Sequence, residues 1–211
     1  MINLTTNSIS LDLFHTILKE IKNRPDYALD LMDSLSKNQF KSKGRILRLI
    51  DDLKLGHTDE VVILGCWYGS ILIPILHPKL KRVTGIDIDA KVISASRHNL
   101  FKGYENLELI TGDVFSLDLA RYRDTTLLIN TSCEHMTPMK SWPFWKNLHS
   151  DAYFALQSNN MFGIDGHTNC VNSLDEFRLQ LPENCIILAE DELIDDRGTR
   201  YTIVGKLTPA I

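Results

Sequence analysis

The sequence has few cysteines, and they are scattered along the chain. Its 211 residues include only Cys66, Cys133, Cys170 and Cys185, and no two of these make a Cys-x-x-Cys pair. Disulfide frameworks belong mostly to small secreted domains that cannot build a large core, and this chain is longer than such domains. We therefore expect reduced thiols and a cytoplasmic location.

Long apolar runs are also missing. The longest apolar stretches are too short to cross a bilayer, so we expect no membrane-spanning segment. The first residues, Met1-Ile2-Asn3-Leu4-Thr5-Thr6, lack a basic stretch followed by a long apolar one. This pattern predicts no signal peptide.

An excess of positive charge is missing as well. The formal net charge is -4 and the isoelectric point is about 6.0. Nucleic-acid-binding domains usually carry a basic surface that meets phosphates, so a nucleic-acid partner is possible but not favoured. RNA stays a less favoured candidate for the acceptor because of one short basic segment, Lys41-Ser42-Lys43-Gly44-Arg45.

What the sequence does contain is a regular alternation of strand and helix patterns. Residues 8 to about 55 have apolar residues at helical spacing, beginning with Ile9 and interrupted at Pro25. A second helix is predicted over 27–35 and a third over 45–53. Predicted strands then cover 61–64, 82–86, 107–110, 126–129, 152–157, 185–189 and 201–206, with helices starting at 71, spanning 92–100 and spanning 174–181.

These patterns predict an α/β fold. Alternating strands and helices build a doubly wound, mostly parallel sheet, here of seven strands, and the last two strands suggest an antiparallel pair. We divide the chain into a helical N-terminal extension, 1–56, and a sheet domain, 57–211. The extension packs on the sheet, or it serves as a lid or a dimerisation element.

The most informative stretch lies at the end of the first predicted strand. An apolar run, Val61-Val62-Ile63-Leu64, leads into Gly65-Cys66-Trp67-Tyr68-Gly69, and Asp87 ends the next strand. In open α/β sheets a tight glycine turn after the first strand approaches a nucleotide, and a carboxylate about 20 residues later accepts hydrogen bonds from the ribose. The alternative for Asp87 is the N-cap of the following helix.

The strand order, the glycine turn, Asp87 and Asp113 together resemble the class I S-adenosylmethionine-dependent methyltransferases over residues 58–206. Gly65 and Gly69 match the outer glycines of that family's turn, whereas its acidic residue falls on Ile63 and its middle glycine on Trp67. The resemblance implies a Rossmann-like fold and S-adenosyl-L-methionine as cofactor. It implies cofactor contacts at the following positions: Gly65, Cys66, Trp67, Gly69, Asp87, Ile88, Asp113 and Val114.

Within that resemblance, Asp87 would accept from the ribose hydroxyls and Ile88 would lie against the adenine. Asp113, in Gly112-Asp113-Val114-Phe115, would contact the adenine amino group. The alternative for Asp113 is an ordinary turn, because Gly-Asp pairs are common there.

Polar and titratable residues follow the fourth predicted strand, in Asn130-Thr131-Ser132-Cys133-Glu134-His135-Met136. Ligands bind beyond the carboxyl ends of strands in open sheets, so we expect Asn130, Glu134 and His135 to face the methyl acceptor. His135 suits a general base because imidazole titrates near neutrality. Glu134 would bind an amino group or act as the base. The alternative is a helix start capped by Thr131 or Ser132.

Two further groups of residues have weaker patterns. We expect no metal, although Cys133, His135, His167 and Cys170 offer a ligand set that suits zinc. The aromatic segment Trp142-Pro143-Phe144-Trp145 either walls a substrate pocket or anchors a loop to the core, and its bulk favours anchoring.

The sequence thus predicts a methyltransferase whose acceptor is a small molecule or a protein. Ile63 and Trp67 motivate two alternatives: a site that uses the cofactor differently or takes another nucleoside, and a methyltransferase-like scaffold without catalysis. An RNA methyltransferase is a third.

Overall fold

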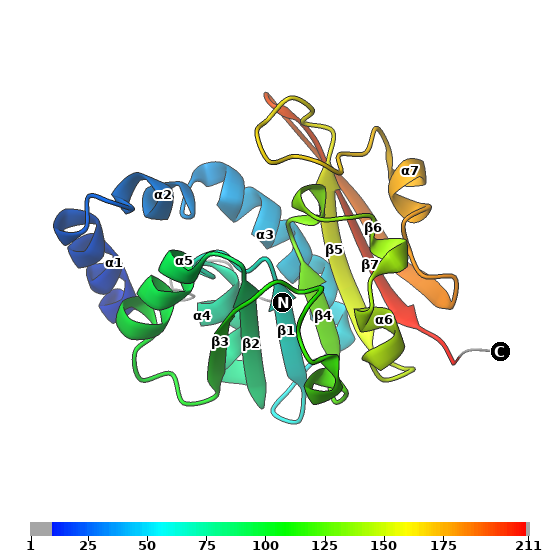
Figure 1. The fold of residues 1–211 in the computed structure, drawn as a ribbon, viewed down its shortest axis with the longest axis horizontal. Coiled ribbons are helices and arrows are strands. Elements are labelled where there is room, and N and C mark those ends of the chain that lie inside the picture. The colour runs from blue at the N-terminus through cyan, green and yellow to red at the C-terminus, as the bar shows by residue number, and fades with distance from the viewer. Residues whose placement is uncertain (1–9, 210–211) are drawn as a thin grey trace.

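The computed structural model describes residues 10–209, so Ile9 and the rest of the first nine residues lie outside the described part. Its seven strands form one sheet in the order β3-β2-β1-β4-β5-β7-β6 (Figure 1). The first five strands in that order run parallel, and β7 is antiparallel to both β5 and β6. The strands are β1 (Glu60–Leu64), β2 (Arg82–Asp87), β3 (Leu107–Thr111), β4 (Leu127–Asn130), β5 (Tyr153–Asn159), β6 (Cys185–Asp195) and β7 (Gly198–Leu207). The predicted fold is confirmed.

The central strands are mostly apolar because both faces of the sheet are covered. All five residues of β1 are buried. Val61 and Ile63 join one hydrophobic cluster, and Val62 and Leu64 join the other. Successive side chains of a strand point to opposite faces, so β1 needs apolar residues from Val61 to Leu64, whereas Glu60 at its start pairs with Lys81 and Arg82.

The α-helices that follow β1 are short. They are α4 (Leu72–Leu76), α5 (Ala90–Ala95), α6 (Phe144–Asn147) and α7 (Leu174–Arg178). The last of these ends three residues before the predicted boundary at 181. The final hairpin is longer than predicted, because polar residues of β6 and β7 continue the pairing up to Asp195 and Gly198.

The N-terminal arm consists of α1 (Leu11–Asn23), α2 (Ala28–Asp33) and α3 (Lys37–Ile50), shown in blue in Figure 1. Its first and third helices begin at serine N-caps, Ser10 and Ser36, whose hydroxyls accept from backbone N–H groups. The cap at Ser36 starts α3 eight residues before the predicted Arg45, within a polar stretch that apolar periodicity does not mark.

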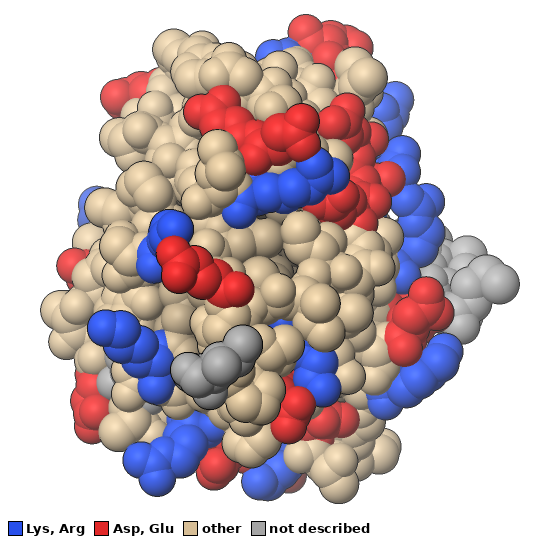
Figure 2. Space-filling model, turned by 90° about the vertical axis from the view of Figure 1, so that its right-hand side faces the viewer, with Lys and Arg blue, Asp and Glu red and all other residues tan. Residues whose placement is uncertain are grey.

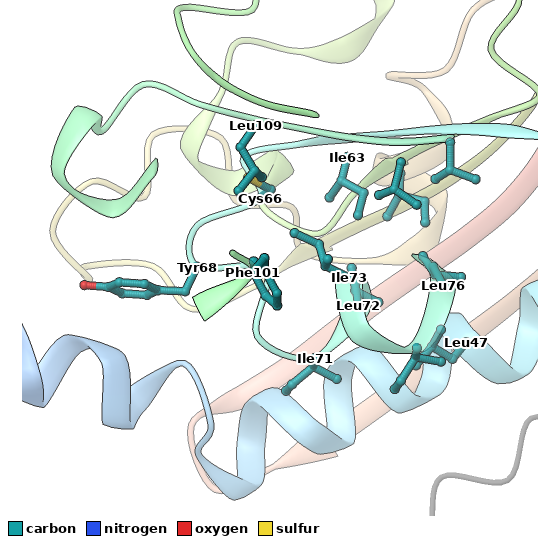
Figure 3. Packing of buried hydrophobic residues seen from close by; sticks show 14 of the residues in the cluster. Leu47, Ile63, Cys66, Tyr68, Ile71, Leu72, Ile73, Leu76, Phe101 and Leu109 are labelled. Carbon is teal, nitrogen blue, oxygen red and sulfur yellow. The ribbon is translucent and has the colours of Figure 1, made fainter. Parts of the chain in front are cut away.

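The arm packs against the sheet domain through apolar and polar contacts. Leu31, Ile46 and Leu47 are fully buried in the cluster that contains Val61 and Ile63. Figure 3 shows Leu47 beside the apolar residues of α4. The Ser42 hydroxyl donates to Gln157 Oε1 at 2.8 Å, and Gln157 Nε2 returns a bond of 3.0 Å to the Ser42 carbonyl. These contacts agree with the packing interpretation of the arm, and the boundary near residue 56 stays a prediction.

None of the helices within residues 10–209 has the length and apolar character needed to span a membrane.

Candidate functional site

A cavity of about 780 Å³ lies beyond the carboxyl ends of the parallel strands. The glycine turn after β1 and the ends of β2 and β3 line one part of it, and the segment after β4 lines another. Asp30 and Asp33 of α2 and Lys43 of α3 also line it, so the N-terminal arm forms part of the wall. In Figure 1 the arm lies at the same end of the sheet as the loop after β5.

The turn after β1 is held in a left-handed backbone conformation at three positions. Gly65 has φ of 57°, Trp67 of 50° and Gly69 of 64°. At Gly69 a Cβ atom would also lie 2.1 Å from Ile73 Cδ1, so only glycine fits. Trp67 adopts the conformation that glycine adopts freely, although an L-residue strains there by about 1 kcal/mol.

Three contacts hold Trp67 in this conformation. Its backbone N–H donates to Asp87 Oδ2 at 2.7 Å, and its indole Nε1 donates to Asp30 Oδ2 at 3.2 Å. The indole also packs on the ring of Tyr68, with 5.6 Å between centroids. The indole is therefore directed toward α2, and the turn keeps its shape without a middle glycine.

Asp87 is fixed by its own backbone surroundings. Its Oδ2 accepts from Trp67 N, and its Oδ1 accepts from Asp89 N at 3.0 Å. Asp89, and not Asp87, caps α5, because its carboxylate accepts from Lys91 N and Val92 N. The N-cap interpretation of Asp87 is therefore wrong. Each of its oxygens keeps a second acceptor position, so the carboxylate can receive two hydroxyl donors.

The other predicted cofactor residues line the same cavity. Ile88 is 73% exposed, which leaves its side chain free to contact a flat ligand. Asp113 Oδ1 accepts from Phe115 N at 3.0 Å, as the turn interpretation expects, and Asp113 lines the cavity beside the buried Val114. The Cys66 thiol donates to its neighbour's carbonyl at 3.4 Å, and burial raises the pKa of Cys66 well above its usual value.

Of the three predicted acceptor-facing residues, Asn130 does not line the cavity. It is fully buried at the end of β4, where its Oδ1 accepts from Ser132 N at 2.7 Å and its Nδ2 donates to Met136 Sδ at 3.0 Å. Both groups of the amide hold the turn after β4 in shape, so Asn130 supports the cavity wall without lining the cavity. Glu134 and His135 do line the cavity.

Glu134 is a buried carboxylate, 3% exposed, and its two oxygens differ in their hydrogen-bond partners. Its Oε1 accepts from Asn159 Nδ2 at 2.6 Å and pairs with Arg200 Nη1 at 3.1 Å. Its Oε2 is buried and has no hydrogen-bond partner. Asn159 and Arg200 face each other across the β5–β7 pair, so the sheet register places both donors on the same oxygen.

Two histidines meet beside Glu134. His135 lies in the one-turn segment Cys133–His135, and His167 lies in the loop after β5, with their rings perpendicular and 4.6 Å apart between centroids. The loop is tied to this turn because Thr168 N and Asn169 N both donate to the Glu134 carbonyl at 2.9 Å. Burial lowers the pKa of His167 below its usual value.

The sequence did not place Arg200, Asn159 or Lys43 beside Glu134. Arg200 and Asn159 come from strands whose register a single sequence does not reveal. Lys43 lies on the part of α3 that the apolar pattern missed, and its Nζ donates to Gln39 Oε1 at 2.6 Å. Burial, with repulsion from Arg200 as a smaller cause, lowers the pKa of Lys43 to about 7.

Replacing Lys43 with methionine should stabilise the protein more at pH 6 than at pH 9. The folded-state pKa of about 7 lies below the usual lysine value, so burying the charged amine costs stability in full below pH 7. That cost shrinks as the pH rises from 7 toward 10.5, where the amine loses its proton in both states. Urea unfolding at the two pH values measures the gain, with Lys41→Met as an exposed control. Equal gains at both pH values would contradict the prediction.

The zinc set built on two cysteines is not assembled. Cys133 is fully buried and its thiol is directed to the Asn130 carbonyl and Met139 Sδ, away from the histidines. The aromatic segment has the anchoring role: Trp142, Phe144 and Trp145 are buried in the second core cluster and do not line the cavity.

No protein-family profile matches the chain. It is 35% identical over 83 residues to ribosomal RNA small subunit methyltransferase A of Persephonella marina, a match that covers 39% of this chain and 31% of that protein. It is 29% identical over 99 residues to the protein of the same name from Halothermothrix orenii, which covers 47% and 32% of the two chains. The matches therefore span about a third of the length of these curated relatives.

Solved structures agree over much more of the chain. The N-methyltransferase NodS of Bradyrhizobium japonicum, in complex with S-adenosyl-L-homocysteine, superposes with a TM-score of 0.67 at 14% identity and covers 94% of this chain and 99% of its own. An S-adenosylmethionine-dependent methyltransferase of Clostridium acetobutylicum gives 0.63 at 13% identity, with coverage of 88% and 100%. The chain therefore has the Rossmann-like fold of the class I S-adenosylmethionine-dependent methyltransferases.

Proposed function

We propose that this protein transfers a methyl group from S-adenosylmethionine to a nitrogen or oxygen atom of a small molecule or a protein. The observation that carries the proposal is that one continuous cavity holds both groups of residues. It joins the left-handed turn and Asp87 at one end to Glu134 and His135 at the other.

The residues at the first end fit the cofactor. Gly65, Trp67 and Gly69 shape the turn, Asp87 has two free acceptor positions for a ribose, and Ile88 offers exposed apolar surface to an adenine. Ile63 offers no acceptor for an amino group, but the Asp30 and Asp33 carboxylates line the same cavity. When bound, the cofactor supplies a reactive sulfonium methyl group, and the protein supplies alignment and exclusion of water.

The second end is suited to holding an acceptor and removing its proton. His135 Nδ1 lies 3.0 Å from the Gly166 carbonyl, which can only accept, so the neutral ring carries its proton on Nδ1 and leaves Nε2 as an acceptor. An unprotonated imidazole nitrogen beside an exposed cavity wall can take a proton from an acceptor. The ion pair between Glu134 and Arg200 lines the same cavity as His135.

The contacts of the basic segment after residue 40 bear on the class of acceptor. Ser42 is buried against Gln157, Lys43 faces the cavity, and Arg45 pairs with Asp191 at 3.0 Å. These residues form no basic track for phosphates, and on the face in Figure 2 acidic and basic side chains are interspersed. RNA is the second candidate acceptor, supported by the curated relatives that are named for ribosomal RNA methylation.

The four unpaired cysteines support a cytoplasmic location.

Calorimetric titration with S-adenosylmethionine tests the proposal. We expect one binding site per chain and, with methyl-labelled cofactor, label transferred to a small-molecule or protein fraction of a cell extract. Label in RNA instead would select the second candidate. Binding without any transfer would favour the scaffold alternative, and no binding to the cofactor would refute the proposal.

A further inference from the structure

Glu134, His135 and His167 form a cluster that the proposed methyl transfer does not need in full. Each residue brings one possible ligand atom to within 4.8 Å of the others. The three come from two segments, the turn after β4 and the loop after β5, and the hydrogen bonds from Thr168 N and Asn169 N to the Glu134 carbonyl lock these segments together. The fold therefore brings together a buried Glu134, a half-buried His167 and an exposed His135.

Both histidines are oriented in the way that metal ligands are. His135 Nδ1 lies 3.0 Å from the Gly166 carbonyl, and His167 Nδ1 lies 3.0 Å from the Met161 carbonyl. A histidine that donates one ring N–H to a backbone carbonyl has its other nitrogen unprotonated and available to a cation. The same arrangement occurs on both rings, which meet at 87°.

The carboxylate supplies the independent observation. Glu134 Oε2 is buried and has no hydrogen-bond partner, whereas Oε1 is held by Asn159 and Arg200. A buried carboxylate oxygen without a partner costs free energy, so native structures rarely leave one. A structural ion pair with Arg200 explains Oε1 and leaves Oε2 unexplained. Oxygens of metal-binding carboxylates are commonly divided in this way, one on the ion and one on outer donors.

We propose that Glu134, His135 and His167 bind one divalent transition-metal ion, such as Zn²⁺ or Fe²⁺. Two imidazoles and one carboxylate are a ligand set that such ions accept, with the remaining coordination positions open. Two ligands about 2.1 Å from one ion lie roughly 3.4 Å apart in tetrahedral geometry, so ligand atoms within 4.8 Å of one another need to close by at most about 1.4 Å on binding. The open positions face the cavity that all three residues line.

The ion's role rests on the proposed function, although its binding does not. At this end of the cavity the ion would hold the nitrogen or oxygen of the acceptor and lower its pKa. His135 would then act through the ion and would not itself take the proton. This favours an acceptor with a heteroatom that coordinates metals, such as an amine, a phenol or a carboxylate.

The test is metal binding to the full chain after treatment with a chelator. Calorimetry with ZnCl₂ should give one site per chain, and Co²⁺ should produce the visible absorption of a protein-bound ion. His135→Ala and His167→Ala should each weaken Zn²⁺ binding at least about 100-fold, because even outer-shell changes cost 10- to 100-fold. His98→Ala, which removes an exposed histidine that does not line the cavity, should bind as the wild type does.

Thermal melting of each variant without metal shows whether it is folded. If His135→Ala is unfolded, His167→Ala and the conservative Glu134→Gln carry the test. No binding to the wild type, or equal binding to the wild type and folded His167→Ala, would overturn the proposal. Loss in His98→Ala would place the ion elsewhere and also overturn it. Metal binding in a protein that does not bind S-adenosylmethionine would keep this site and refute the proposed function.

Discussion

Replacing Asp87 with alanine should weaken the binding of S-adenosylmethionine by roughly 10²- to 10⁴-fold. Two hydrogen bonds to a charged acceptor are worth about 3–6 kcal/mol together, and both would be lost. The free energy of unfolding should fall less, by about 1–3 kcal/mol, because Trp67 N and Asp89 N lose their acceptor. Calorimetric titration and urea unfolding of the same sample measure the two effects.

Asp118→Ala is the matched control for this variant. Asp118 is also a carboxylate that accepts a backbone N–H, from Ala120 at 3.1 Å, but it does not line the cavity. It should cost some stability and leave cofactor affinity unchanged. If Asp87→Ala binds the cofactor as tightly as Asp118→Ala does, Asp87 has only a structural role in the turn.

Replacing Arg200 with methionine should lower the free energy of unfolding by about 3–5 kcal/mol in metal-free buffer. The substitution leaves the Glu134 carboxylate buried without its cation, and both side chains are well covered, at 12% and 3% exposure. For a chain of this length the loss corresponds to a melting temperature lower by roughly 10 °C. Differential scanning calorimetry with a chelator present measures it.

Two further variants separate burial of the charge from loss of an ordinary ion pair. Adding Glu134→Gln to Arg200→Met removes the stranded charge, so the double variant should be more stable than Arg200→Met alone. Arg24→Met breaks an exposed pair with Asp26, 50% and 58% exposed, and should change stability very little. A cost for Arg200→Met no larger than that of Arg24→Met would contradict the prediction.

The cofactor end of the cavity was predictable from the sequence because its signals are local. A buried strand requires the continuous apolar run Val61–Leu64, and the tight turn requires glycines at 65 and 69, whatever the rest of the chain does. Trp67 is the exception, since its left-handed conformation depends on a contact with Asp30, which only the folded arm brings near.

The acceptor end was only half predictable. Glu134 and His135 follow a strand directly, and their place at the sheet edge follows from the topology. The contact of Arg200 with Glu134 crosses 66 positions and depends on the register in which β7 pairs with β5. For Asn130 the prediction was wrong. Its position at the end of β4 suggested a ligand contact, but its buried amide bonds to Ser132 and Met136 in the turn that follows.

The bond between Ser42 and Gln157 joins residues 115 positions apart, and α3 also contacts both strands of the final hairpin. During synthesis on a ribosome the first helices therefore emerge well before the strands that cover them. The helices of the arm can complete their packing only after β5, β6 and β7 have been made. Contacts of such long sequence separation close late in folding, so the arm that walls the cavity is completed only when the last strands have emerged.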